Sequence, residues 1–220
     1  MSELKNFFNL LHNKTKRDYQ ARATERKAEF ASIAKKFERD YWDGSRDTGY
    51  GGYYNDGRWR VVAEKIVSEY GLNSHSKILD VGCGKGFLLA EIVELVPGIK
   101  IAGIDVSSYA IENADEKVRS ELKIGNACKL EFTNHSFDLV ISINTLHNLP
   151  LRELIQALQE IQRVSKKDSY ICVESYRNET EKWNLMRWQL TCEAFYDPQS
   201  WKYMFSLAAY SGDFEFIYFE

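Results

Sequence analysis

A glycine-rich turn between two apolar segments constrains this chain more than any other feature of its sequence. Residues 77–105 read KILDVGCGKGFLLAEIVELVPGIKIAGID, which predicts a strand, a turn, a helix, a second strand and a final carboxylate. The glycines at Gly82, Gly84 and Gly86 follow a G-x-G-x-G spacing, whereas the dinucleotide-binding fingerprint requires a glycine where Phe87 stands. The segment therefore predicts part of a parallel α/β sheet, with a nucleotide-type ligand site at the turn.

Two carboxylates lie at the ends of the two predicted strands. Asp80 comes just before the glycines, and Asp105 ends the second strand. Because ligands of open parallel sheets bind beyond the carboxyl ends of the strands, we expect both side chains to face one cleft. Asp80 can accept hydrogen bonds from a cationic group, and Asp105 can bind both hydroxyls of a ribose.

Two alternatives compete with this interpretation of the turn. The nearest functional alternative is phosphate binding, and the simplest alternative is a glycine-rich turn that binds no ligand. A phosphate-binding loop needs G-K-[ST], but here Lys85 is followed by Gly86 and Phe87. Asp80 would also repel a pyrophosphate lying over the turn. A ligand that carries ammonium and sulfonium charges suits this carboxylate better.

The first two motifs resemble those of the class I S-adenosylmethionine-dependent methyltransferases. ILDVGCGKGF, residues 78–87, resembles the family's first motif, whose glycine loop holds the methionine part of the cofactor. GIDVS, residues 103–107, resembles the second motif, in which Asp105 matches the ribose-binding carboxylate. The resemblance implies a Rossmann-like α/β fold, with a mainly parallel sheet flanked by helices.

Two later segments continue the resemblance in the same order. GNACKLEF, residues 125–132, is similar to the segment after the third strand, where Asn126 replaces the acid that binds the adenine amino group. The Asn126 amide can still accept from that amino group or donate to a ring nitrogen. FDLVISINTLHNLP, residues 137–150, resembles the fourth-strand motif that leads into the acceptor site, and Asn144 is expected at the methionine end of the cofactor.

The resemblance implies S-adenosyl-L-methionine as cofactor and S-adenosyl-L-homocysteine as product. The residues that would bind the cofactor are Asp80, Gly82, Gly84, Gly86, Phe87, Asp105, Val106, Asn126, Ala127 and Asn144. An NAD-dependent oxidoreductase is disfavoured because Phe87 replaces a glycine of the dinucleotide fingerprint.

Composition limits the class of protein and its partners. The 220 residues, 44% hydrophobic and 28% charged, are sufficient for one domain with a single core. A net charge of −3 offers no broad basic surface and argues against a nucleic-acid partner. The four cysteines form no C-x-x-C pair, so we expect reduced thiols and no metal site. Neither a signal peptide nor a membrane-spanning run is evident, which favours a cytoplasmic protein without membrane contact.

The chain divides into an N-terminal segment, residues 1–59, and a cofactor-binding domain, residues 60–220. Residues 1–40 are basic with a spacing of apolar residues compatible with amphipathic helix, so they can cap a cleft, form a homodimer or contact RNA. Residues 40–60 are rich in aromatic residues and glycine. We expect this stretch to be a lid over cofactor and substrate, although a surface loop packed on the core fits nearly as well.

Strands and helices alternate from residue 60 onward, which predicts a mainly parallel sheet. The expected helices are 60–70, 87–96, 108–119 and 151–164, and the expected strands are 77–81, 100–104, 121–125, 137–143 and 169–174. Residues 176–211 are expected to be helical with a break at Asp197-Pro198, and the chain ends in an alternating strand. Family members usually finish with two strands, the last one antiparallel, whereas this chain supplies one.

The predicted acceptor site lies at the ends of the fourth and fifth strands. Methyl transfer from a sulfonium is an in-line displacement, in which alignment dominates and a base assists when the acceptor is a hydroxyl. His147 is the expected general base, with Glu174 and Tyr176 as reserves, and Arg177 could hold an anionic substrate. We also expect substrate contacts from Tyr50, Tyr53, Trp59, Glu174, Tyr176 and Arg177.

These expectations favour a methyltransferase that acts on an oxygen or nitrogen of a small polar metabolite. Residues 144–147 read Asn-Thr-Leu-His and lack the [DN]-P-P-[YF] motif typical of enzymes that methylate nucleobase or amide nitrogens. Two alternatives remain from the sequence: an RNA-modifying enzyme that binds through its basic N-terminal segment, and a non-catalytic module that only binds the cofactor.

Overall fold

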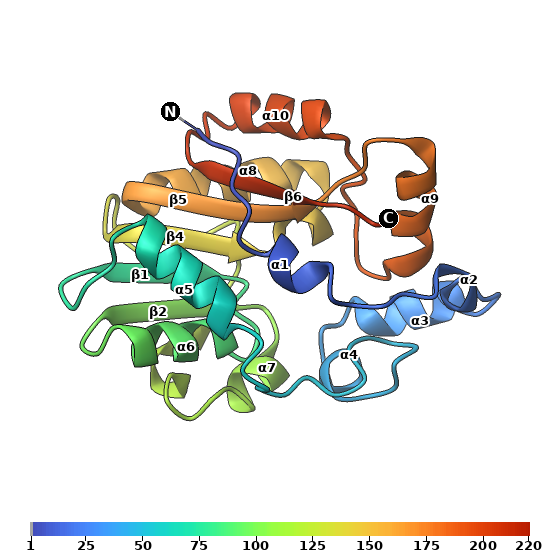
Figure 1. The fold of residues 1–220 in the computed structure, drawn as a ribbon, viewed down its shortest axis with the longest axis horizontal. Coiled ribbons are helices and arrows are strands. Elements are labelled where there is room, and N and C mark those ends of the chain that lie inside the picture. The colour runs from blue at the N-terminus through green and yellow to red at the C-terminus, as the bar shows by residue number, and fades with distance from the viewer. Residues whose placement is uncertain (1) are drawn as a thin grey trace.

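The computed structural model describes residues 2–220, which form one parallel sheet covered by helices on both faces (Figure 1). The sheet has six strands in the order β3-β2-β1-β4-β5-β6, and all five strand pairs are parallel. The strands are β1 (Lys77–Val81), β2 (Lys100–Asp105), β3 (Leu122–Ile124), β4 (Phe137–Ile143), β5 (Ser165–Glu174) and β6 (Asp213–Ile217). The predicted α/β fold class is confirmed.

Helices connect the strands except between β3 and β4, where residues 125–136 form an irregular connection, and shorter helices precede the first strand. The main helices are α5 (Arg60–Glu69), α6 (Phe87–Leu95), α7 (Ser108–Glu112), α8 (Leu151–Val164), α9 (Glu179–Trp188) and α10 (Pro198–Leu207). The N-terminal helices are α1 (Asn9–His12), α2 (Tyr19–Arg22), α3 (Lys27–Ala34) and α4 (Arg39–Trp42). Two 3₁₀ turns, η1 (Arg119–Glu121) and η2 (Leu146–Asn148), complete the elements. No helix within residues 2–220 is both long and apolar enough to cross a bilayer.

The core has two layers because successive strand residues point to opposite faces of the sheet. Ile78 packs with helices α5 and α6, whereas Leu79 packs with α8 and α10 on the other face. Helix α8 buries Leu154, Leu158 and Ile161, whose spacing places them on one side of the helix. The two layers hold the sheet rigidly, so that the carboxyl ends of its strands form a fixed platform.

The edge at β6 is covered by the start of the chain. The Lys5 amide donates to the Phe214 carbonyl at 2.8 Å, and the Phe214 amide donates to the Glu3 carbonyl at 3.0 Å. Since residues 3–5 satisfy this edge, the sheet needs no antiparallel strand there. The single final strand that the sequence predicts is confirmed, and it runs parallel to β5.

The N-terminal segment is divided into short helices instead of one long amphipathic helix. The buried Glu215 carboxylate accepts hydrogen bonds from the amides of Phe7, Phe8 and Asn9, which fixes the start of α1. Asp18 then caps a separate helix, α2, by accepting from the two amides that follow in its first turn. Figure 1 shows α2 and α3 below α9, at the end of the sheet toward which the strands point, and α4 between α3 and α7.

Candidate active site

A cavity of about 450 Å³ opens at the carboxyl ends of β1, β2, β3 and β4, within the range typical of small-molecule sites. We name it the glycine-turn cavity. Nine of the ten residues expected to bind the cofactor line it: Asp80, Gly82, Gly84, Phe87, Asp105, Val106, Asn126, Ala127 and Asn144. These residues come from four strand ends that are far apart in the sequence, so the parallel sheet brings them together as the motif order predicts.

Gly86 is the predicted member that does not line the cavity. It caps the start of α6 with a φ of +73°, a backbone conformation that favours glycine. A Cβ atom at this position would lie 2.7 Å from Leu122 and 2.9 Å from Val118. Gly86 therefore allows the turn to pack closely against the β3 side of the sheet, and the structure does not bring it to the cavity lining.

The Asp105 carboxylate is fixed by backbone amides at the cavity wall. Its Oδ2 accepts from the Gly84 amide at 2.8 Å and its Oδ1 from the Ser107 amide at 2.9 Å. Burial raises the pKa of Asp105, while these hydrogen bonds act in the opposite direction. Each carboxylate oxygen retains a second lone pair, so the side chain can still accept from two hydroxyl groups.

Asp80 is buried beside the turn and has no hydrogen-bond partner among residues 2–220. Burial, followed by the neighbouring Asp105 carboxylate, raises the pKa of Asp80 to about 8. At neutral pH this carboxyl group therefore holds a proton, and a cationic ligand group beside it would favour the charged form. An ammonium is the natural partner for such a site.

Asparagine side chains line the two sides of the cavity. The Asn126 Oδ1 accepts from the Cys128 amide at 2.8 Å, which leaves the NH₂ group of Asn126 as its available donor. Asn144 has a φ of +57°, and its buried Oδ1 has no partner among the described residues. Asparagine is among the few non-glycine residues that tolerate this left-handed backbone conformation.

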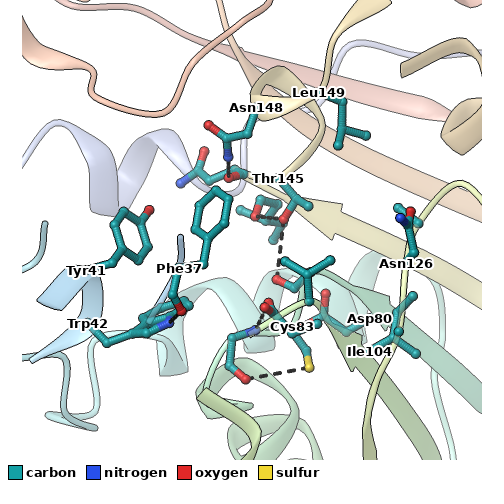
Figure 2. Close-up of a pocket in the computed structure, with 18 of the residues that line it drawn as sticks. Phe37, Tyr41, Trp42, Asp80, Cys83, Ile104, Asn126, Thr145, Asn148 and Leu149 are labelled. Atoms are coloured by element: carbon teal, nitrogen blue, oxygen red, sulfur yellow. Dashed lines mark hydrogen bonds between the residues drawn. The ribbon is translucent and has the colours of Figure 1, made fainter. Parts of the chain in front are cut away.

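An aromatic wall faces these strand ends across the cavity. Figure 2 shows Phe37, Tyr41 and Trp42 on one side and Asn126 on the other. The Trp42 indole nitrogen donates to the Ser107 hydroxyl at 2.9 Å, and its ring occupies the space beside Gly84 that a Cβ atom would need. The sequence indicated an aromatic lid but not this wall, since Phe37 lies outside the aromatic-rich stretch and nothing distinguishes Trp42 within it.

A partly buried ion pair joins the aromatic segment to the glycine turn. Lys85 Nζ lies 2.6 Å from Asp43 Oδ2 and donates to the Tyr53 carbonyl at 2.8 Å. The Tyr109 hydroxyl donates to the same Asp43 oxygen at 2.8 Å. The hydrogen bonds lower the pKa of Asp43, whereas its partial burial acts to raise it. We name Asp43, Lys85 and Tyr109 the latch.

A second cavity, of about 440 Å³, adjoins the first. The two share five lining residues: Tyr41, Tyr50, Tyr53, Trp59 and Asn144. The second cavity also contains His147, Glu174 and the side chains of Arg17, Arg22, Arg46 and Arg58, and we name it the arginine-lined cavity. Tyr50, Tyr53, Trp59 and Glu174, all predicted to contact substrate, therefore lie around one space.

Tyr176 and Arg177, also predicted to contact substrate, line neither of these two cavities. Arg177 pairs with Glu181 and Glu220 and lies 4.2 Å above the Tyr218 ring, outside both cavities. Tyr176 lies beneath the Lys182 ammonium at 5.2 Å. The chain turns away from the sheet after β5 toward α9, so a residue two positions beyond the strand no longer faces the site.

His147 and Glu174 form a buried pair at the base of the arginine-lined cavity. The Glu174 amide donates to His147 Nδ1 at 3.3 Å, and His147 Nε2 lies 3.4 Å from Glu174 Oε2. Burial lowers the pKa of His147 to about 3 and raises that of Glu174 to about 8. The imidazole is therefore neutral, with its proton on Nε2, because Nδ1 already accepts a hydrogen bond. Glu174 Oε2 has no hydrogen-bond partner among the described residues.

Comparison with known proteins agrees with this geometry. The profile of the family described as "Methyltransferase domain" matches residues 72–209. An uncharacterised methyltransferase from Schizosaccharomyces pombe is 31% identical over 142 residues, which cover 54% of this chain and 50% of the relative. Demethylmenaquinone methyltransferase from Lactiplantibacillus plantarum is 33% identical over 126 residues, covering 53% and 51%. The chain thus spans about half the length of these curated relatives.

Solved structures show the same fold at lower identity. A chain of the complex between the Haloferax volcanii Trm112 methyltransferase activator and its methyltransferase partner aligns with a TM-score of 0.57 at 21% identity, covering 82% of this chain and 75% of that one. The YcgJ protein of Bacillus subtilis aligns with a TM-score of 0.55 at 19% identity, covering 66% of each chain. The family match does not include residues 1–71. These residues contain the aromatic wall and all four arginines of the arginine-lined cavity.

Proposed function

The chain belongs to the class I S-adenosylmethionine-dependent methyltransferase family, and from that premise we propose that it methylates an oxygen or nitrogen of a small polar molecule. The observation that carries this proposal is the meeting of two cavities at Asn144. One is lined by the glycine turn and Asp105, and the other by the His147–Glu174 pair. Two adjoining spaces are what a transfer between two bound molecules requires.

The glycine-turn cavity suits S-adenosylmethionine in the chemistry of its lining. When bound, this cofactor supplies a methyl group on a positively charged sulfur. Asp105 would accept from the ribose hydroxyls, and Asp80 with the unpartnered Asn144 oxygen would accept from the ammonium group. The free NH₂ of Asn126 would donate to an adenine ring nitrogen. S-adenosylhomocysteine would leave as the product.

We assign proton removal from the acceptor to Glu174, with His147 as the residue that positions it. His147 is the base that the sequence predicts, but its Nδ1 lone pair is already engaged and its pKa is low. Glu174 has a free oxygen and a pKa of about 8, which is near the value that favours a base at neutral pH. A general base of this kind contributes about 10²- to 10⁴-fold in rate.

The aromatic stretch of the N-terminal segment, residues 1–59, would serve as the lid, and residues 60–220 as the cofactor domain. The latch and the shared aromatic lining support this division, since segment 37–59 contacts both cavities. Exclusion of water by such a cover strengthens the electrostatic interactions inside the site. A homodimer and a cytoplasmic location remain predictions from the sequence.

Calorimetric titration with S-adenosylhomocysteine tests the cofactor site. Wild-type protein should bind, and Asp105→Ala should weaken binding about 100-fold, since hydrogen bonds to a charged group are lost and the Gly84 amide is left unpaired. Glu116→Ala, which removes an exposed carboxylate from the same region, should bind as the wild type does. Absence of binding by the wild type, or equal binding by Asp105→Ala, would overturn the proposal.

A further inference from the structure

Three arginines of the N-terminal segment surround one indole ring in the arginine-lined cavity. The guanidinium carbons of Arg17, Arg22 and Arg46 lie 5.5, 5.3 and 5.3 Å from the centre of the Trp188 ring. All four side chains line the cavity. Burial lowers the pKa values of Arg17 and Arg22, and the like charge of the neighbouring Arg46 lowers them further.

No carboxylate among residues 2–220 forms an ion pair with any of these three arginines. Arg17 donates to the carbonyls of His12 and Thr15, and Arg46 to those of Gly49 and Tyr50. Arg22 likewise donates to carbonyl oxygens. Carbonyls satisfy hydrogen bonds but form no ion pair, in contrast to Arg58 in the same cavity, which pairs with Asp56. The carboxylates that act on Arg17 and Arg22 without forming an ion pair are Glu174 and Asp47.

Donors for a ligand also remain. Arg17 Nε is buried and has no hydrogen-bond partner, while Arg46 uses one of its three nitrogens for both of its hydrogen bonds. An oxyanion is the group that guanidinium donors recognise in pairs. Glu174 in the same cavity does not neutralise the cluster at neutral pH, because burial raises its pKa to about 8.

We propose that Arg17, Arg22 and Arg46 form an oxyanion subsite, so that the methyl acceptor is a small molecule carrying a carboxylate or phosphate group. This inference rests on the proposed function, since it identifies the class of acceptor for the same site. The subsite lies inside a cavity of about 440 Å³, which suits a small molecule better than a polymer. The aromatic residues Tyr50, Tyr53 and Trp59 supply flat surfaces for the remainder of the acceptor.

The test compares anions with neutral molecules of matched shape. Benzoate and benzamide form one pair, and phenyl phosphate and phenol form the other. Each is titrated calorimetrically into the full-length protein, with and without saturating S-adenosylhomocysteine, in low-salt buffer without phosphate. We expect one or both anions to bind at least about tenfold more tightly than the neutral match, and to lose this preference as salt increases. The better anion distinguishes carboxylate from phosphate.

Arg46→Gln should remove most of the preference for the anion, and Arg46→Lys should retain part of it. Arg26→Gln removes the same charge from the same segment at an exposed pair with Glu29 and should leave the preference unchanged. Unchanged S-adenosylhomocysteine affinity in Arg46→Gln would show that the fold is intact. Failure of the wild type to bind S-adenosylhomocysteine would count against the proposed function, whereas the titrations without it still test the subsite.

Equal affinity of the wild type for the anion and its neutral match would overturn the subsite. An equal loss of the preference for the anion in Arg46→Gln and in Arg26→Gln would also overturn it. Tighter binding of a short single-stranded RNA than of phenyl phosphate would also overturn it, because the cluster would then serve a polymer.

Discussion

The two cavities are built in different ways. The glycine-turn cavity is formed at the ends of strands β1 to β4, where backbone amides hold Asp105 and the turn follows directly from the glycines. The arginine-lined cavity is formed by side chains from the N-terminal segment, the aromatic loop, the ends of β4 and β5, and the residues after α9. A common cofactor requires a common backbone, whereas an individual acceptor is matched by side chains that can change without altering the fold.

The largest expected effect is on the rate of methyl transfer, which depends on the arginine-lined cavity, and not on cofactor affinity, which depends on the glycine-turn cavity. Glu174→Gln should slow methyl transfer by about 10²- to 10⁴-fold, because the amide cannot take a proton from the acceptor. Its affinity for S-adenosylhomocysteine should stay within about twofold, since Glu174 does not line the glycine-turn cavity. Transfer of a labelled methyl group measures the rate, with the exposed Glu179→Gln as control. An unchanged rate would exclude Glu174 as the base.

The second prediction concerns the attachment of the N-terminal segment. The buried Glu215 carboxylate accepts from three backbone amides and from the Tyr170 hydroxyl at 2.6 Å. In Glu215→Gln an NH₂ group would face one of these donors, so the free energy of unfolding should fall by about 3 kcal/mol. Urea denaturation measures the change, and the exposed Glu29→Gln should have little effect. Equal stability of both variants would show that this anchor contributes little.

The third prediction is a pH dependence specific to the glycine-turn cavity. The pKa of Asp80 is about 8, so at lower pH a cationic ligand group can pair with it only after the proton leaves. Affinity for S-adenosylhomocysteine should therefore rise with pH up to about 8, by at most about tenfold per unit. Calorimetry at pH 6, 7 and 8 measures this trend. Asp80→Asn should flatten it, and a flat profile in the wild type would mean that Asp80 does not contact the ammonium.

The smallest expected effect concerns the latch between lid and turn. Lys85→Met removes the ion pair with Asp43. Because this pair is only partly shielded from solvent, we expect the closed, cofactor-bound state to lose about 1 kcal/mol of stability. This corresponds to roughly fivefold faster dissociation of S-adenosylhomocysteine. Stopped-flow measurement of the dissociation rate tests the prediction against Lys117→Met, which removes an exposed pair with Glu94. Equal rates for both variants would indicate that the latch does not retain the cofactor.

The fold and the first cavity could be predicted because their signals are local. Strand 137–143 and helix 151–164 have the predicted bounds, since their apolar spacing follows the period of each element. Strand β5 begins at Ser165, four residues before the prediction, because its first residues are polar and carry no strand pattern. Helix 108–119 is shorter than predicted and ends at Glu112, after which the backbone amide of Asp115 bonds to the Lys85 carbonyl.

The second cavity could not be predicted because its members meet only in three dimensions. Arg17, Arg22 and Arg46 have no fixed spacing, and their relation to Trp188 depends on how the N-terminal segment folds back over the sheet. The positions of His147 and Glu174 at strand ends predict that both lie at the site. Their shared burial, which lowers the pKa of His147 and raises that of Glu174, depends on packing and is not evident from the sequence. Titration of a buried pair cannot be inferred from sequence position alone.

Incubation of the protein with S-adenosylmethionine carrying a labelled methyl group, together with metabolite fractions separated by charge, tests the central claim most directly. We predict that the label is transferred to a small molecule in the anionic fraction, and that Asp105→Ala and Glu174→Gln each abolish most of the transfer. Absence of transfer to every fraction, or undiminished transfer by both variants, would contradict the assignment of the two cavities to cofactor and acceptor.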